Sequence, residues 1–185
     1  AEFNTATMDP EKYTHYLQPD YKAQLQELYS GFNASVGEAM VAGGNAFSKP
    51  VDGAVMYNFG TELIVNGMAD KYVVNGIDYR LETGASIKAS QRGVVIYASE
   101  DTVYGNMLVI DHGYGIKSHY YGLGSLGKSV GDTVQEGEII GTAGISGLVY
   151  TENSAKIATL HFAVTLDGVF LNPNTLFKDG IVIVG

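Results

Sequence analysis

A short run near the C-terminal end of the chain, residues 159–164, carries the residue types that most directly suggest chemistry. Side chains alternate between faces in a β-strand, so Thr159, His161 and Ala163 are expected to share one face. A hydrolytic zinc site on such a face needs a metal ligand and a proton-transfer group side by side. Here the imidazole of His161 is flanked by a threonine and an alanine. The run therefore predicts a site that keeps its architecture and has lost its catalysis.

The composition of the 185-residue chain argues against several functions. The net charge is -9, from 20 acidic and 11 basic residues, whereas nucleic-acid binding depends on lysine and arginine contacts to phosphate. The absence of cysteine excludes thiolate metal sites, disulfides and a cysteine nucleophile. No apolar run approaches the roughly 20 residues of a membrane-spanning helix. The chain starts at Ala1 rather than methionine, and we expect a membrane anchor in the full-length protein.

Residues 9–41 show a helical pattern. Asp9-Pro10 resembles an N-cap followed by proline at the first helical position, and Gly43-Gly44 ends the pattern. Segment 1–45 is therefore predicted to be a helical extension, which either packs on its own domain or forms a dimerisation arm. Its apolar stripe, at spacings of three and four, consists of Tyr21, Leu25, Leu28, Phe32, Val36 and Met40.

The remainder of the chain, residues 46–185, changes to a pattern of strands joined by glycine-containing turns. Glycine (24) and tyrosine (13) are abundant, and no alternation of helices with strands indicates a parallel sheet. The pattern predicts a mainly β domain, an antiparallel β-sandwich or barrel-like fold. The expected strands are 51–59, 76–79, 86–89, 94–98, 107–111, 117–123, 138–143, 160–166 and 181–184.

Several short motifs occur in a fixed order along this β region. They include Asn75-Gly76-Ile77-Asp78-Tyr79, Asp111-His112-Gly113, Tyr120-Tyr121-Gly122-Leu123, Val130-Gly131-Asp132, Leu160-His161-Phe162 and Asn172-Pro173. Each motif is short, but the ordered set resembles the LytM/lysostaphin-type zinc endopeptidases, which cleave peptide cross-links in bacterial cell walls. The resemblance implies their β-rich fold, the duplicated hybrid motif.

The family resemblance also implies five active-site positions, of which this chain keeps two. Asp78 and His161 stand at two zinc-ligand positions, whereas the third ligand position is Val74. The two positions that hold catalytic histidines in the family are Gly122 and Thr159.

Three further residues, Tyr120, Tyr121 and Asn75, are expected to line the vestigial groove. Catalytic zinc usually has three protein ligands, so the expected outcome is no cofactor, with weak zinc binding by Asp78 and His161 left open. The alternative for this pair is a hydrogen bond without metal.

The other histidines are not expected to restore the site. His15 lies in the predicted helical region, and His112 belongs to a motif that the family has outside its zinc shell. By strand alternation, Tyr120 and Gly122 share a face, so His119 is expected to point away from the site unless a bulge re-aims it.

The resemblance and the substitutions together predict a catalytically inactive, peptidase-like domain outside the cytoplasm, on the periplasmic or cell-wall side. It would act as a cell-wall scaffold or regulator, for instance in cell shape, through protein–protein binding. Expected partners are an active relative of the same family, a cell-wall amidase or a second copy in a dimer. Two alternatives remain open: a zinc-dependent peptidoglycan endopeptidase with a non-standard site, and a module that binds peptidoglycan without cleaving it.

Overall fold

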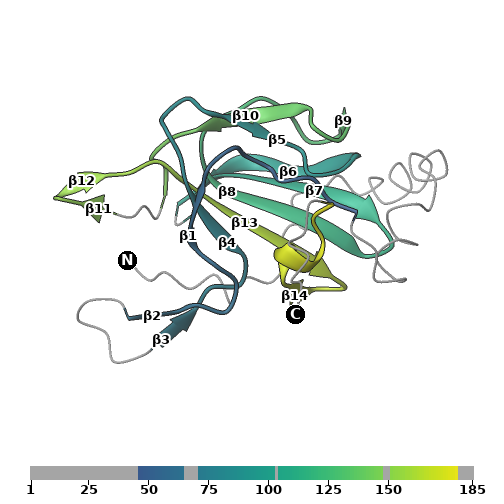
Figure 1. The fold of residues 1–185 in the computed structure, drawn as a ribbon. Helices are drawn as coiled ribbons and strands as arrows, with labels where there is room; N and C mark the ends of the chain where they lie inside the picture. The colour runs from purple at the N-terminus through teal and green to yellow at the C-terminus, as the bar shows by residue number, and fades with distance from the viewer. Residues whose placement is uncertain (1–45, 65–70, 103, 148–150, 179–185) are drawn as a thin grey trace.

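The computed structural model describes residues 46–64, 71–102, 104–147 and 151–178 (Figure 1). The predicted helical extension and the predicted strand 181–184 lie outside these residues. No helix in the described part of the chain is long and apolar enough to cross a membrane. The described elements are β1 (Ala54–Tyr57), β2 (Glu62–Ile64), β3 (Lys71–Val73), β4 (Ile77–Arg80), β5 (Ser86–Lys88), β6 (Gly93–Asp101), β7 (Gly105–Gly113), β8 (Ile116–Leu126), β9 (Thr133–Val134), β10 (Ile139–Ala143), β11 (Thr151–Glu152), β12 (Ala155–Lys156), β13 (Thr159–Leu166), β14 (Val169–Leu171) and the 3-10 helix η3 (Pro173–Thr175).

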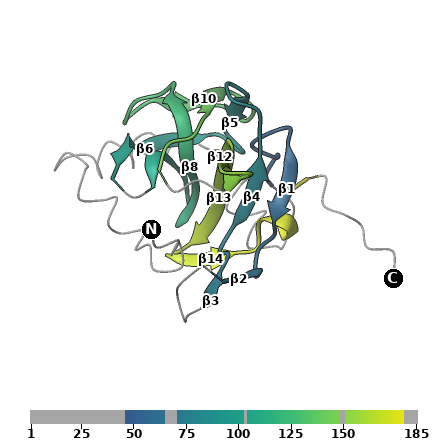
Figure 2. The same cartoon turned by 90° about the vertical axis from the view of Figure 1, so that its left-hand side faces the viewer.

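Ten of these strands form one sheet whose main path runs β1-β4-β13-β8-β7-β6-β9. The strand pairs within it are antiparallel, and β5, β10 and β14 attach to the side of this path. Figure 2 shows β8, β13, β4 and β1 side by side, with β5 and β10 over one end of the sheet. The mainly β, antiparallel fold is therefore confirmed.

Strand alternation divides the apolar side chains of the sheet between two faces. The inner core lies between the long strands and the β5–β10 layer, and it includes Leu108, Phe162 and Ile140. A second set of buried residues, here called the outer cluster, projects from the opposite face of β6, β7 and β8. It consists of Val94, Ile96, Tyr97, Met107, Val109 and Tyr121.

Two-residue turns hold the hairpins in register. Asp167 and Gly168, between β13 and β14, both have positive φ (49° and 83°). Tyr114 and Gly115, between β7 and β8, have φ of 56° and 78°. Positive φ at both central positions is the signature of the type I′ turn, whose twist matches that of the flanking strands. These turns fix which residues face each other within the β7–β8 and β13–β14 hairpins.

Close backbone contact beside β4 makes Gly76 a sensitive position. A Cβ at Gly76 would clash with the carbonyl oxygen of Phe162 on the neighbouring strand. We expect Gly76→Ala to lower the free energy of unfolding, measured by urea denaturation, by at least about 3 kcal/mol or to prevent folding. Gly60→Ala is the control. The φ of Gly60 is 84°, but no neighbouring atom lies within 4 Å of an added Cβ, so this substitution should lower the free energy of unfolding by only about 1–2 kcal/mol. Equal costs would contradict the role of the close contact.

Candidate functional site

The register of the sheet brings the two surviving family positions together. His161 on β13 pairs with Asp78 on β4 on one side and with Tyr121 on β8 on the other. Residues directly opposite each other in an antiparallel pair project to the same face. Asp78, His161 and Tyr121 therefore lie side by side on the outer face of the sheet.

Both ring nitrogens of His161 are engaged in hydrogen bonds. Nδ1 lies 2.7 Å from Asp78 Oδ1, and Nε2 lies 2.8 Å from Asn75 Oδ1. The ring of Tyr121 stacks on the imidazole at a centroid distance of 5.5 Å and an interplanar angle of 25°. Asp78 and His161 are only 1% and 6% exposed. The imidazole is thus fixed on both edges and on one face by protein groups.

The donor set does not fit a catalytic zinc ion, which needs three protein ligands and an open position. Val74, at the position where the family resemblance puts the third ligand, is apolar and buried. Asn75 Oδ1 lies against the second nitrogen of His161. Within the described residues, no group of three or more His, Cys, Asp or Glu side chains is arranged to hold a metal ion. No reaction step is therefore assigned to a metal at this site.

Gly122 sits at an irregularity of β8 that directs this position towards the site. Asn106 pairs with Leu123 and Met107 pairs with Tyr121, so Gly122 is the extra residue of a bulge. Its φ is 84°, and a Cβ there would have only ordinary contacts, with the carbonyl oxygens of Thr159 at 3.6 Å and Ser146 at 3.7 Å. Gly122 and Thr159 are therefore neighbours, and a Cβ at Gly122 would fit without a clash. Neither residue has a side chain that can act as a general acid or base.

Two sequence-based expectations about β8 are wrong, for one reason. Tyr120 does not line the groove: it is fully buried in the inner core, where its ring lies 5.3 Å from that of Phe162. His119 does not point away from the site face: it pairs with Ala163 and stacks on Tyr121 at 6.0 Å. Counting alternate residues back from Gly122 puts Tyr120 on the site face and His119 on the other face. The bulge at Gly122 adds one residue, so positions 119 to 121 take the opposite faces.

His119 still does not supply the missing chemistry. Its Nε2 lies 2.9 Å from Thr165 Oγ1, so this nitrogen is engaged away from His161. Burial, and then the nearby charge of Lys117, lower the pKa of His119 to about 3. His119 is therefore neutral and held in place at neutral pH.

His112 lies on the opposite, inner face of the sheet. Its Nδ1 donates to the Arg92 carbonyl at 2.7 Å, and its Nε2 lies 2.7 Å from Ser118 Oγ. The ring also packs edge-on against Phe47 at 5.2 Å. Burial lowers the pKa of His112 to about 4, partly opposed by the hydrogen bond to Arg92. This histidine belongs to the structural core.

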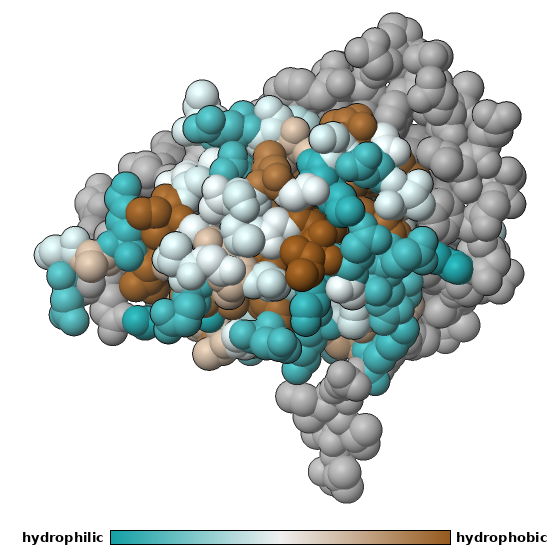
Figure 3. Space-filling model, turned by 90° about the horizontal axis from the view of Figure 1, so that it is seen from above, coloured by the Kyte–Doolittle hydropathy of each residue, from teal (hydrophilic) through white to brown (hydrophobic). Residues whose placement is uncertain are grey.

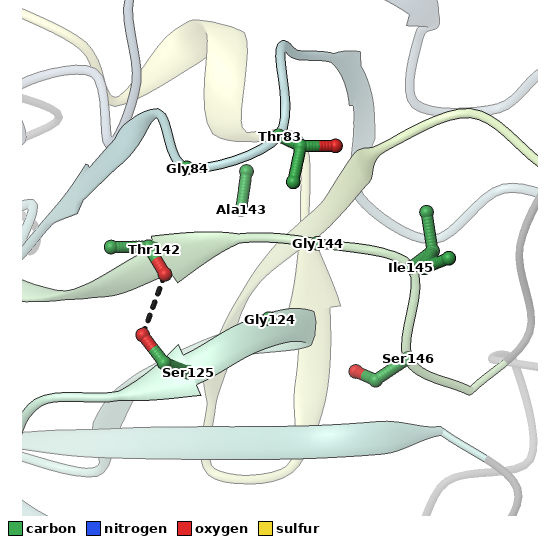
Figure 4. A pocket seen from close by; sticks show the side chains of 9 residues that line it. All are labelled: Thr83, Gly84, Gly124, Ser125, Thr142, Ala143, Gly144, Ile145 and Ser146. Carbon is green, nitrogen blue, oxygen red and sulfur yellow. Dashed lines mark hydrogen bonds between the residues drawn. The ribbon is translucent and has the colours of Figure 1, made fainter.

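A surface cavity of about 540 Å³ lies next to this region, and motif reasoning missed it (Figure 4). Ser146 connects the two, because it lines the cavity and its carbonyl faces Gly122. The signal in the sequence was the set of small residues in two separate runs, 122–125 and 141–147. The lining residues are Thr83, Gly84, Gly124, Ser125, Thr142, Ala143, Gly144, Ile145 and Ser146.

A mainly antiparallel β-sheet that carries a buried Asp–His pair is the architecture expected of a LytM-type peptidase domain. The model of peptidase family M23 matches residues 72–173, more than half of the chain. The chain therefore belongs to peptidase family M23.

Individual proteins agree with this assignment. Stage II sporulation protein Q of Bacillus subtilis (strain 168) is 32% identical over 100 residues, covering 53% of this chain and 34% of the relative. The DD-carboxypeptidase/endopeptidase Mpg of Neisseria meningitidis serogroup B (strain ATCC 13091 / M2091) is 31% identical over 98 residues, covering 53% and 21%. The matches thus span about a third of the first relative and about a fifth of the second.

Solved structures show the same fold. A zinc-containing peptidase from Vibrio cholerae superposes with a TM-score of 0.62 at 26% identity, covering 69% of this chain and 39% of that one. The SpoIIQ–SpoIIIAH pore-forming complex contains a chain with a TM-score of 0.62 at 23% identity, covering 74% and 94%. The described sheet therefore shares the fold of these structures.

Proposed function

We propose that this chain is a catalytically inactive M23 domain that works by binding another protein at the cell wall, outside the cytoplasm. The observation that carries the proposal is the closed hydrogen-bond set of His161, whose two ring nitrogens meet Asp78 and Asn75. A peptidase of this type needs His161 to hold a metal beside a proton-transfer group. Gly122 and Thr159 offer no such group, so hydrolysis has no base and no activated water.

Binding needs a surface, and the cavity supplies one. Its walls are made of short side chains and glycine backbone, which suit an extended segment of a partner. Ile145, in its lining, and Ile139, nearby on β10, are about half exposed. Figure 3 shows the molecule from above, with apolar patches set among polar side chains. The partner we propose is an active M23 relative or a cell-wall amidase.

The relatives support a binding role without establishing it for this chain. One of the similar structures is, by its name, a complex of SpoIIQ with a second protein, SpoIIIAH. Other relatives are named for peptidase activity or for cell division. A fold that serves both kinds of protein is compatible with a member that binds and does not cleave.

The first experiment combines zinc analysis with a cleavage assay. After purification without chelators, we expect far less than one zinc per chain and no cleavage of muropeptides, because two ligands and no proton relay remain. A catalytically complete M23 domain, purified and assayed in parallel, is the positive control. Stoichiometric zinc together with muropeptide cleavage would establish the endopeptidase alternative instead.

The second experiment asks what the cavity binds. The chain is used as bait in cell-envelope extracts and is also mixed with purified sacculi. We expect a specific protein to be retained and the chain to stay in the supernatant of the sacculi. Thr83→Arg, in the cavity wall, should weaken retention, whereas Thr133→Arg, an exposed residue of β9, should not. Sedimentation with sacculi, lost in Thr83→Arg, would show instead a wall-binding module.

A further inference from the structure

Residues 46–48 are held against the stretch just before β6 by a set of hydrogen bonds, here called the clasp. The Ser48 backbone nitrogen donates to the Ser90 carbonyl at 2.9 Å, and the Ser48 hydroxyl donates to the same oxygen at 3.2 Å. Gln91 Nε2 donates to the Ala46 carbonyl at 2.6 Å. The clasp therefore depends on the positions of two neighbouring residues, Ser90 and Gln91.

A closed ring of buried hydrogen bonds starts and ends on this same stretch. The Ser90 backbone nitrogen donates to Tyr120 Oη at 2.9 Å, and Tyr120 Oη lies 3.0 Å from Ser118 Oγ. Ser118 Oγ lies 2.7 Å from His112 Nε2. His112 Nδ1 lies 2.7 Å from the Arg92 carbonyl oxygen, which closes the ring. Ser118 and Tyr120 are fully buried, and His112 is 5% exposed. The ring thus connects His112 to the residues that form the clasp.

Neutral His112 satisfies this ring with one arrangement of hydrogens. The Arg92 carbonyl can only accept, so Nδ1 carries the imidazole proton and Nε2 is an acceptor. Ser118 must then donate to Nε2, and Tyr120 must donate to Ser118. A second proton, placed on Nε2, would reverse both hydroxyl groups and leave the Tyr120 hydrogen without an acceptor in the ring. The closed ring therefore favours the neutral imidazole.

Burial acts in the same direction as the ring. It lowers the pKa of His112 to about 4, partly opposed by the hydrogen bond to the Arg92 carbonyl. The charged or titratable residues on the elements around the imidazole are Arg92, Asp111, Lys117, His119, Tyr120 and Lys178. Asp111 lies opposite Lys117 across β7 and β8, and Lys178 forms an ion pair with Glu136 at 2.7 Å. In the described ranges of the chain, no carboxylate forms an ion pair with His112. A charge on His112 is therefore not compensated while the clasp is closed.

Phe47, the middle residue of the clasp segment, covers the imidazole. Its ring packs edge-on against that of His112, at a centroid distance of 5.2 Å and an interplanar angle of 79°. His112 itself is the extra residue of a bulge in β7, between Asp111 and Gly113. Because a bulge residue stands outside the regular pairing of the strands, opening of the clasp can bring water to the imidazole while β7 and β8 stay paired.

We propose that the clasp is a proton-sensitive switch, in which release of residues 46–48 is coupled to the binding of one proton at His112 Nε2. The open form, with its imidazole in water, binds the proton more readily than the closed form, so falling pH favours opening. The segment is also the covalent connection to residues 1–45, and its release would free this end of the described domain. The switch lies on the inner face of the sheet and does not involve Asp78 or His161.

Hydrogen exchange of the Ser48 amide, followed by NMR on the complete chain at pH 6.5 and 5.0, tests the proposal. The protection factor, which corrects for the intrinsic exchange rate at each pH, measures how often the clasp opens. The ordinary histidine pKa of about 6.5 applies to the open form, and the lower value of about 4 applies to the closed form. The protection factor of Ser48 should therefore fall about 10-fold between these two pH values.

The two buried histidines on opposite faces of the sheet provide matched variants. In His112→Gln the fall should disappear, because glutamine does not titrate in this range. In His119→Gln the fall of about 10-fold should remain. His119 is held by Thr165 on the other face, so opening of the clasp does not expose it.

Four results would overturn the proposal. A protection factor that is equal at both pH values, or a fall that persists in His112→Gln, would show that His112 does not control the clasp. A fall of about 100-fold or more, reduced to about 10-fold in His119→Gln, would show that Ser48 exchanges by unfolding of the whole domain. If His112→Gln does not fold, the tautomer decides. Nitrogen-15 NMR of the unmodified chain at pH 6.5 should find the imidazole proton on Nδ1, and a proton on Nε2 would contradict the ring.

Discussion

Replacing Asp78 with alanine should lower the free energy of unfolding by about 3–5 kcal/mol, as found when one member of a buried pair is removed. The carboxylate is 1% exposed and lies 2.7 Å from His161 Nδ1. Its loss would leave the imidazole nitrogen buried without that partner. Asp78→Asn keeps the Oδ1 acceptor and should cost less, about 1–2 kcal/mol. Urea denaturation at pH 7.5 measures both variants.

The exposed ion pair between Glu136 and Lys178, 2.7 Å apart, provides the comparison. Glu136→Ala should cost less than about 1 kcal/mol, because exposed pairs are screened by solvent. Each protein is also denatured with and without a chelator. If the chelator destabilises the unmodified chain but not Asp78→Ala, then the Asp78–His161 pair holds a metal, and the hydrogen-bonded arrangement is not the state that stabilises the fold.

The long strands and the site strand could be predicted from the sequence because glycines bound their apolar runs at short, regular intervals. The run at 159–164 was predicted to place His161 and Thr159 on one face, and β13 does so. The predicted strand 94–98 is part of β6, which extends further, to Asp101. Strands β2, β3, β9, β11, β12 and β14, each of two or three residues, were not predicted; of the three-residue strands only β5 was, where glycine precedes the run.

The errors in the candidate site come from registers that no local pattern encodes. A bulge adds one residue on one strand, and here it puts Tyr121 and Leu123, two residues apart, on opposite faces of the sheet, where alternation predicts a shared face. Asn75 was expected only as a groove residue, yet its Oδ1 lies within hydrogen-bond distance of His161 Nε2. That contact depends on the turn before β4 lying over β13, which is a tertiary feature.

The second large effect expected is acid destabilisation by two buried histidines on opposite faces of the sheet. The pKa of His112 is lowered to about 4 and that of His119 to about 3, mainly by burial. The ordinary histidine pKa is about 6.5. Between 6.5 and these lower values, the unfolded chain binds protons that the folded chain does not. The stability that comes from keeping these histidines neutral is therefore fully present above about pH 6.5, and it is lost as the pH falls towards 4 and 3.

The size of this decline follows from about 1.4 kcal/mol for each pH unit and each histidine. From pH 7.5 to 5.0, each histidine should contribute a loss of about 2 kcal/mol, and the pair about 4 kcal/mol. Urea denaturation at both pH values measures the loss. His119→Gln can keep a hydrogen bond to Thr165 but does not titrate, so it should halve the pH dependence while leaving that of His112. If the variant and the unmodified chain lose the same free energy between pH 7.5 and 5.0, His119 is protonated in the folded state as readily as in the unfolded one, and its burial does not produce the acid sensitivity.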